Sequence, residues 1–292
     1  TPLYSSAASD VYKRQVRSQL CIVFPEDRCE GTKLAADNLE GEQNMSGHSK
    51  WKTIKRRKGA ADSKRGALFT KLAREIQIAA KESADVEYNF RLRLAVDKAK
   101  ANSMPKENIE RAIRRGSGSE QADELLEIAY EGYGPGGVAL YIEVLTDNRQ
   151  RTVSEIRHAL TRANGAMGES GSVAWQFEPR GYITIPMNGM NEDQIFEAAL
   201  DAGAEDVEFG EELAEIFTEA GDLKLVQDAF RKRGFKIETS ELTMKPKMLL
   251  ALDDKTAFSV MGLMENLEEL EDVTSVYSNL DISEELLSRM EE

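Results

Sequence analysis

Charged residues are segregated along this chain, and the segregation constrains its fold more than any other feature. Residues 45–115 carry 19 basic and 8 acidic side chains, a net charge of +11, whereas residues 116–292 carry 14 basic and 37 acidic side chains, a net charge of −23. Such an asymmetry is typical of a polyanion-binding module joined to an acidic body. The overall charge of −14 conceals it and, taken alone, would argue against a nucleic-acid partner.

The size and composition predict a multidomain protein with real hydrophobic cores. A chain of 292 residues, 41% of them hydrophobic, suggests roughly two domains, or three if some are small. No stretch approaches the roughly 18 consecutive apolar residues of a membrane-spanning helix, so we expect no membrane association.

Residues 1–44 differ from the rest of the chain. They contain both cysteines, Cys21 and Cys29, so a disulfide framework or a cysteine-based zinc site is excluded for the remainder. Their short apolar run makes a poor signal peptide, and their acidic residues do not suit a transit peptide. We expect an extraneous or disordered leader with the true start at Met45, and hence a cytoplasmic protein.

A dense cationic arm follows Met45. The next 20 positions contain eight basic residues and one acid. This density, together with a tryptophan that could stack on a base, is typical of phosphate neutralisation in nucleic-acid binding. The alternative is a solvated tail that the tryptophan anchors to the body. The predicted contact residues of the arm are His48, Lys50, Trp51, Lys52, Lys55, Arg56, Arg57, Lys58, Lys64 and Arg65.

Three amphipathic helices are predicted to complete a basic domain over residues 45–120. Apolar residues recur every three to four positions over 67–82 and 90–101, and a third helix begins at Pro105 and ends before Gly116. Helical bundles with basic surfaces are common without a nucleic-acid partner, so the bundle alone is weak evidence. The outward-facing cations predicted to add phosphate contacts are Lys71, Arg74, Arg91 and Arg93.

The acidic body is predicted to be α+β, with one domain inserted into another. Residues 178–244 show the order βαββαβ, the ferredoxin-like motif. Residues 121–177 and 245–292 are predicted to form a second, discontinuous ferredoxin-like domain. Its expected elements are strands at 126–130, 138–145, 172–177, 248–252 and 273–279 and helices at 152–163 and 256–267; those of the insertion are strands at 182–185, 206–209, 213–218 and 236–242 and helices at 193–202 and 223–233.

Seven motifs are spread along residues 45–175: Met45-Ser-Gly-His-Ser-Lys-Trp51, Phe69-Thr-Lys-Leu72, Arg91-Leu-Arg-Leu94, Asn108-Ile-Glu-Arg-Ala-Ile113, Tyr130-Glu-Gly-Tyr-Gly-Pro-Gly-Gly-Val138, Thr146-Asp-Asn-Arg149 and Gly171-Ser-Val-Ala-Trp175. In this order they resemble the YebC/PmpR family, which also includes mitochondrial translational activators. The resemblance covers residues 45–292, and it implies the same three-domain α+β fold. Phe90, where the family usually has Pro, and a loop at 83–88 without Gly or Pro depart from the family pattern at the first interhelix turn.

The sequence indicates no catalytic site, no metal site and no cofactor. The chain has two histidines, His48 in the arm and His158 in a predicted helix, and neither has neighbours that suggest a base or a ligand. The glycines at 132–137 predict a turn, because no Gly-Lys-Ser/Thr and no helix follows them directly. An enzyme with a site between the α+β domains is therefore a remote alternative.

A polar cluster in the body has two interpretations. Asn148, Arg149 and Arg151 stand between a predicted strand and a predicted helix. They could be a helix N-cap with neighbouring surface charges, or a second contact to phosphate or a partner, because loops carry function disproportionately.

Two functions follow for the whole chain. The resemblance implies a DNA-binding transcriptional regulator, or alternatively a ribosome-associated translation factor that binds structured ribosomal or transfer RNA. Phosphate attraction does not separate the two. The acidic body could also offer a surface to a basic protein partner, and the sequence does not indicate an oligomeric state.

Overall fold

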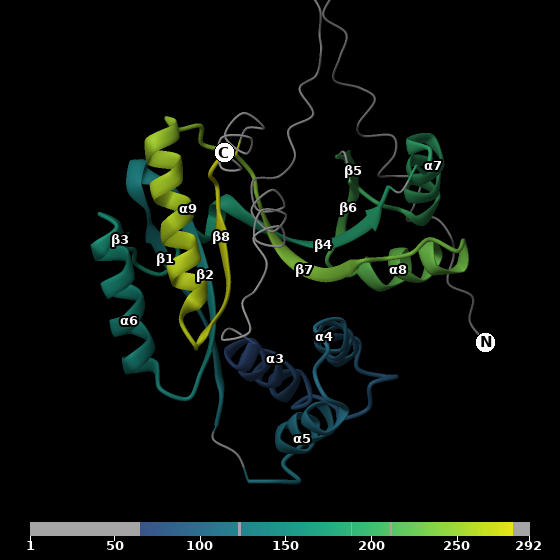
Figure 1. The fold of residues 1–292 in the computed structure, drawn as a ribbon, viewed down its shortest axis with the longest axis horizontal. Coiled ribbons are helices and arrows are strands. Elements are labelled where there is room, and N and C mark those ends of the chain that lie inside the picture. The colour runs from purple at the N-terminus through teal and green to yellow at the C-terminus, as the bar shows by residue number, and fades with distance from the viewer. Residues whose placement is uncertain (1–64, 122–123, 188, 211, 283–292) are drawn as a thin grey trace, which may run out of the picture. The chain divides into compact units, whose positions relative to one another are not determined.

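The computed structural model of the protein describes residues 65–121, 124–187, 189–210 and 212–282. The predicted leader and all of the cationic arm except Arg65 lie outside these residues. The described part begins with the basic helices, continues into a first sheet, is interrupted by a second sheet, and returns to complete the first (Figure 1).

Three helices form the basic domain, as predicted: α3 (Arg65–Ala79), α4 (Phe90–Ala101) and α5 (Lys106–Gly116). Their apolar stripes meet in one core, which includes Leu72, Ile76, Leu92 and Ile109. Gly116 permits the close approach of α5 to α3, because a Cβ at this position would lie 2.2 Å from the backbone oxygen of Gln77.

Asn89 closes the first interhelix turn, whose loop lacks the glycine and proline that are usual in the family pattern. Its side-chain oxygen accepts a hydrogen bond from Leu92 N at 3.0 Å and so caps α4. Its side-chain nitrogen donates to the backbone oxygens of Ala79 at 2.7 Å and Ser83 at 2.8 Å. Phe90 then opens the helix and packs against the core of the second sheet.

The first sheet is antiparallel, with the order β3-β1-β2-β8. Helices α6 and α9 share one core with it (Figure 1). Along β2, Leu140, Ile142 and Val144 belong to that core, whereas Tyr141 and Glu143 alternate with them and therefore face the other side. The elements are β1 (Leu126–Tyr133), β2 (Ala139–Thr146), α6 (Arg149–Arg162), β3 (Ala166–Met167), α9 (Asp254–Glu269) and β8 (Val273–Ser278).

The second sheet confirms the predicted βαββαβ unit. Its antiparallel order is β5-β6-β4-β7, and α7 and α8 pack on it around Ile183, Ile195, Ile216 and Phe230. The elements are β4 (Phe177–Pro186), α7 (Glu192–Ala202), β5 (Asp206–Phe209), β6 (Leu213–Glu219), α8 (Leu223–Lys232) and β7 (Thr239–Pro246).

The predicted α+β, multidomain class is confirmed, but the first sheet differs from the expected motif. Its chain order is ββαβαβ, because the hairpin β1–β2 joins the two central strands directly. The helix and strand that a ferredoxin-like unit inserts there come instead from the end of the chain, as α9 and β8. The domain boundaries remain predictions.

Two expected strands are absent from the described residues, and several element boundaries move. Residues 172–177 contain a 3₁₀ turn, Ala174–Gln176, before β4, because their N–H groups bond to a carboxylate instead of a neighbouring strand. Residues 248–252 contribute only an isolated bridge between Leu250 and Leu280. The last strand of the insertion lies at 239–246 instead of 236–242, and α6 starts at Arg149, three residues before the prediction.

Candidate nucleic-acid interface

The cationic arm meets the described structure at Arg65, the exposed first residue of α3. The other arm residues predicted to contact phosphate, from His48 to Lys64, lie outside the described residues. The predicted helix-face cations can be placed, and each of them is bonded within the chain.

Lys71 and Arg74 attach α3 to the first sheet. Lys71 Nζ donates to the backbone oxygens of Glu268 at 2.5 Å and Val273 at 2.8 Å. Arg74 forms ion pairs with Glu271 at 3.0 Å and Asp272 at 2.9 Å, and its side chain is only 17% exposed. These two cations therefore hold the basic domain on the acidic body, a use that the sequence interpretation missed.

The cations of α4 are also engaged inside the chain. Arg91 forms an ion pair with Glu127 of β1. Arg93 donates to the backbone oxygen of Val86 at 3.1 Å and pairs with Glu87 at 3.1 Å, which ties the helix to the loop before it. Both arginines thus have a structural role, and their phosphate contacts remain predictions.

The polar cluster at the start of α6 has the geometry of a helix cap. Asn148 is the N-cap and accepts a hydrogen bond from Arg151 N at 3.1 Å. The Arg151 guanidinium pairs with Asp147 at 2.7 Å and with Asp272 at 2.8 Å. Arg149 is exposed in the first turn of the helix. The structure brings this cluster together with Arg74 through one shared acid, Asp272.

Asp272 is a buried carboxylate at this junction. It accepts hydrogen bonds from Thr152 at 2.7 Å and Thr146 at 3.1 Å in addition to those from Arg74 and Arg151. Burial acts to raise the pKa of Asp272, but the hydrogen bonds from Arg151, Thr152 and Thr146 outweigh burial and hold the pKa below its ordinary value. Nothing local in the sequence marks this residue, since its partners are far away along the chain.

Helix α5 carries an exposed basic face that the sequence interpretation did not include among the contact residues. Its apolar residues Ile109, Ala112 and Ile113 pack on the core, and its basic side chains lie on the exposed side. Arg114 pairs with Glu120 at 2.6 Å, and Lys106 pairs with Glu110 at 3.5 Å. The amphipathic pattern could have identified the face, whose exposed cations are Lys106, Arg111, Arg114 and Arg115.

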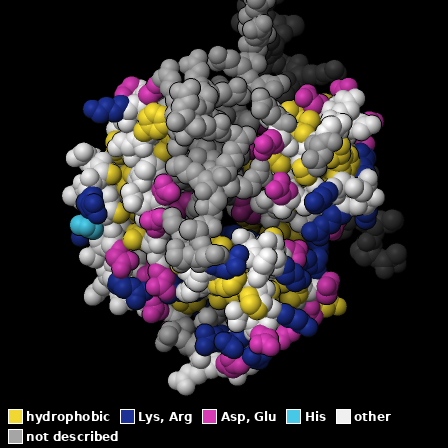
Figure 2. All heavy atoms as spheres, in the orientation of Figure 1, with side chains coloured by type: hydrophobic (Ala, Val, Ile, Leu, Met, Phe, Trp, Pro, Cys, Tyr) yellow, Lys and Arg dark blue, Asp and Glu magenta, His cyan; other side chains and the backbone are white. Residues whose placement is uncertain are grey.

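On the described surface, basic and acidic side chains are interspersed. Figure 2 shows Lys and Arg side chains beside Asp and Glu side chains over the visible face, without one continuous basic area among the residues drawn in colour. The charge separation that is so clear in the sequence is thus reduced in the described structure by ion pairing between the basic helices and the acidic body.

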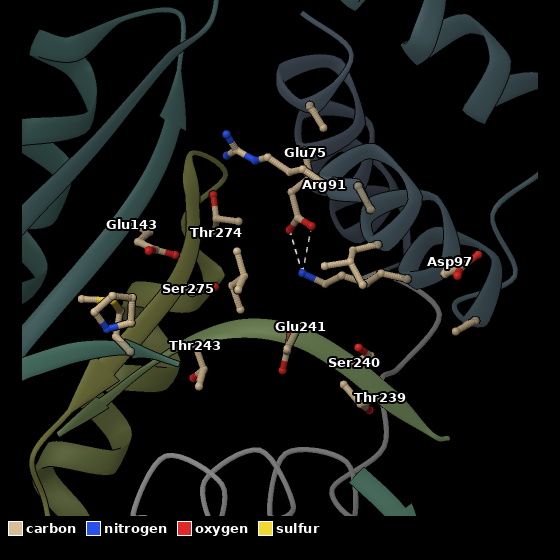
Figure 3. Close-up of a pocket in the computed structure, with 18 of the residues that line it drawn as sticks. Glu75, Arg91, Asp97, Glu143, Thr239, Ser240, Glu241, Thr243, Thr274 and Ser275 are labelled. Carbon is tan, nitrogen blue, oxygen red and sulfur yellow. Dashed lines mark hydrogen bonds and ion pairs between the residues drawn. The ribbon is translucent and has the colours of Figure 1, made fainter. Parts of the chain in front are cut away.

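A cleft of about 920 Å³ lies where the basic helices meet both sheets (Figure 3). Six carboxylates and three cations line it, so its net charge is negative. Lys98 donates to both carboxylate oxygens of Glu75 at 2.9 Å, as the dashed lines mark, and Glu143 and Glu241 flank the opening from β2 and β7. Phosphate is repelled by such a lining, whereas a cationic group is attracted.

The pKa of one carboxyl that lines the cleft, that of Glu143, is raised. Burial raises its pKa, while the hydroxyl of Tyr277, which donates to Glu143 Oε2 at 3.3 Å, acts in the opposite direction. Burial also acts to lower the pKa of Lys98, but the surrounding carboxylates, led by Glu75, raise it above the ordinary value. The cleft therefore holds a firmly charged amine beside a carboxyl that resists ionisation.

The described residues contain no group of three or more His, Cys, Asp or Glu side chains that could hold a metal ion. His158 is exposed on α6. None of the helices that the structure describes is both long enough and apolar enough to cross a membrane.

Comparison with known proteins assigns the chain in two parts. Residues 49–119 match the family description "TACO1/YebC protein N-terminal domain", and residues 125–280 match "TACO1/YebC second and third domain". A "probable transcriptional regulatory protein" of Trichlorobacter lovleyi is 51% identical over 247 residues, which cover 84% of this chain and 100% of the relative. One of Chlorobaculum tepidum is 49% identical over 250 residues, 85% of this chain and 100% of the relative.

A solved structure shares the fold. The crystal structure of the conserved hypothetical protein Aq1575 from Aquifex aeolicus aligns with a TM-score of 0.72 at 44% sequence identity, over 77% of this chain and 94% of the other. The α+β architecture described above is therefore that of a known group of proteins.

Proposed function

The chain belongs to the TACO1/YebC family, and from this we propose that it is a nucleic-acid-binding regulatory protein whose basic N-terminal end makes the contact. The relatives named above are called probable transcriptional regulatory proteins, which supports a role in regulation. We place the function in transcription first, with DNA as the partner.

One observation carries this proposal: some cations of the basic helices are bonded within the chain, whereas those on α5 are exposed. Lys71, Arg74 and Arg93 have partly buried hydrogen bonds within the chain, so releasing them to bind phosphate would leave acceptors without donors. The arm, with Lys55, Arg56, Arg57 and Lys58 at its centre, and the exposed face of α5 then supply the phosphate contacts. Binding of this kind depends on charge and little on base sequence.

A translation factor that binds structured RNA is the second candidate. One observation favours it: Lys71, Arg74 and Arg93 of the described basic helices are bonded within the chain, so they are not available to contact base edges in a major groove. Recognition of nucleic-acid shape, which is common for RNA, fits this surface better than direct sequence readout.

The acidic cleft would limit how nucleic acid approaches. Its carboxylates repel phosphate, so nucleic acid does not enter the cleft and meets the basic end first. We propose that the cleft serves a basic protein partner of the same assembly.

Two measurements test the proposal. Replacing Lys55, Arg56, Arg57 and Lys58 together with Ala should weaken binding of unrelated sequences to the same degree and should reduce the salt dependence of the affinity, and an affinity indifferent to salt would contradict the proposal. Crosslinking in cells, followed by sequencing of bound DNA and RNA in parallel, separates the candidates. Promoter DNA alone supports the first, and ribosomal or transfer RNA alone supports the second.

A further inference from the structure

Trp175 lies on the surface of the acidic body, far along the chain from the basic arm. Its side chain is 65% exposed, and it stands in the short 3₁₀ turn before β4. A large exposed aromatic residue on a loop is unusual enough to raise the question of a binding role.

The loop that carries Trp175 is fixed by a buried carboxylate. Glu131 of β1, only 7% exposed, accepts hydrogen bonds from the backbone N–H groups of Gly171 at 2.6 Å, Val173 at 2.7 Å and Ala174 at 2.8 Å. Burial acts to raise the pKa of Glu131, but the three donors outweigh it and lower the pKa. The buried Glu131 carboxylate thus holds the exposed loop at residues 171–174 in one conformation.

Apolar packing fixes the same loop from the inside. Val173 is fully buried and Phe177 almost fully buried in a cluster with Ala139 and Tyr277. The loop is therefore held before any ligand arrives, which lowers the entropy lost on binding.

The hydrogen bonds of Trp175 leave its ring faces as the surface for recognition. Its indole Nε1 donates to the backbone oxygen of Ser172 at 3.0 Å, and that oxygen also accepts from the Tyr133 hydroxyl at 3.1 Å. Because the indole N–H already donates to Ser172, it is not available to a ligand, and the ligand can contact only the flat faces of the ring. A flat, stackable ligand group fits such a surface, and a ligand that needs a donor from the indole does not.

A cation and a thioether lie next to the loop. Lys247 N donates to the backbone oxygen of Gln176 at 2.8 Å, which places residues 247 and 248 alongside residues 175 and 176. Lys247 is exposed and Met248 is 74% exposed. An aromatic ring, an apolar side chain and an ammonium group in neighbouring positions match a base, its sugar and its phosphate.

We propose that Trp175, with Lys247 and Met248, forms a stacking site for an unpaired nucleobase. The inference rests on the proposed nucleic-acid function and adds to it a second contact, on the acidic body, that requires single-stranded nucleic acid. A paired base is not available for stacking on a protein side chain, so the site distinguishes single strands and loops from duplexes.

The test uses the full chain and the fluorescence of Trp175. The chain has two tryptophans, so a Trp51→Phe background leaves Trp175 as the sole indole and serves as the reference for all other variants. Titration with oligo(U) and with a duplex of equal length should quench the Trp175 emission with oligo(U) only. Trp175→Ala should weaken oligo(U) binding roughly tenfold, the loss of one stacked base, and leave duplex binding unchanged. Trp175→Phe, which keeps a ring, should restore most of the affinity.

The outcomes separate this inference from the proposed function. Unchanged Trp175 emission and unchanged affinity of Trp175→Ala, in a protein whose binding still depends on the arm lysines and arginines, would refute the stacking site and leave the proposed function standing. Quenching by duplex and oligo(U) alike would also refute it. If neither nucleic acid binds at all, the proposed function fails and the stacking site with it. Circular dichroism of Trp175→Ala confirms that the variant is folded.

Discussion

The Asp272 carboxylate accepts two hydrogen bonds from the Arg151 guanidinium, at 2.8 and 3.0 Å, although the Asp272 side chain is only 1% exposed. Arg74 approaches the same carboxylate from α3 at 2.9 Å. One acid thus joins a helix of the basic domain, a helix of the first sheet and the start of β8. Both arginines pair with its charge, and each also pairs with a more exposed acid, Glu271 for Arg74 and Asp147 for Arg151.

We expect Asp272→Asn to lower the free energy of unfolding by about 3 kcal/mol, because it leaves two guanidinium groups without their buried counter-charge. Urea denaturation measures the change. Glu271→Gln is the matched control: Glu271 pairs with the same Arg74 but is 63% exposed, so its loss should cost less than about 1 kcal/mol. Equal effects of the two substitutions would contradict the role given to Asp272.

Stability should fall in acid because of Asp272 and Glu131. Both carboxyls have a folded-state pKa below the ordinary value, so they stabilise the fold when ionised. Their contribution is complete above the unfolded pKa values, about 3.9 for Asp and 4.3 for Glu, and is lost as the pH falls through the lowered folded values. Thermal unfolding below about pH 4 should show this loss, and Glu131→Gln should make the acid dependence shallower.

Glu143 should have the opposite effect on stability. Its folded-state pKa is raised, so its contribution is complete below the unfolded pKa of about 4.3 and is lost as the pH rises through the raised value. We expect Glu143→Gln to be more stable than the parent at pH 8, measured as a higher urea midpoint. Tyr277→Phe removes the hydrogen bond that favours the carboxylate, so it should raise the pKa of Glu143 further. The loss of stability should then extend to higher pH.

The exposed face of α5 should contribute to binding, and the inward cations should not. Arg111→Ala and Arg115→Ala should each weaken nucleic-acid binding and reduce the slope of log affinity against log salt by about 1. Arg93→Ala is the control, since its side chain is 20% exposed and bonded to the preceding loop. A change of slope in Arg93→Ala, with none in the α5 variants, would reverse the assignment.

Gly116 should be intolerant of a side chain. An added Cβ would lie 2.2 Å from the backbone oxygen of Gln77, so Gly116→Ala must push α5 away from α3, at a cost of about 2 kcal/mol. Gly66→Ala, in the first turn of α3, meets no atom within 4 Å and should instead stabilise the protein by about 0.5 kcal/mol. Thermal melting of the two variants side by side measures both.

Periodicity predicted most of the fold because the relevant signals are local. The stripes of α3 and α4 and the βαββαβ order of the insertion follow from spacing along the chain. The strand expected at 172–177 failed because a distant group competes for its backbone. Gly171, Val173 and Ala174 donate to Glu131, at least forty positions away, and so do not pair as a strand.

The charged residues could be predicted as a group but not individually. Composition marks residues 45–115 as basic, whereas the partners of Lys71 and Arg74 lie almost two hundred positions away. No local pattern separates a cation that faces solvent from one that meets a distant carboxylate. The exposed basic face of α5 could have been predicted from the sequence, because the apolar residues of the helix define which side is buried.

The attachment of α3 also has a consequence for the order in which the molecule is made. The described hydrogen bonds of Lys71 and Arg74 all end between residues 268 and 273, from the end of α9 to the start of β8. A ribosome must therefore synthesise almost the entire chain before the basic end can dock. Until then the partners of Lys71 and Arg74 do not exist, so a nascent chain that ends before residue 268 cannot hold its basic end in this way.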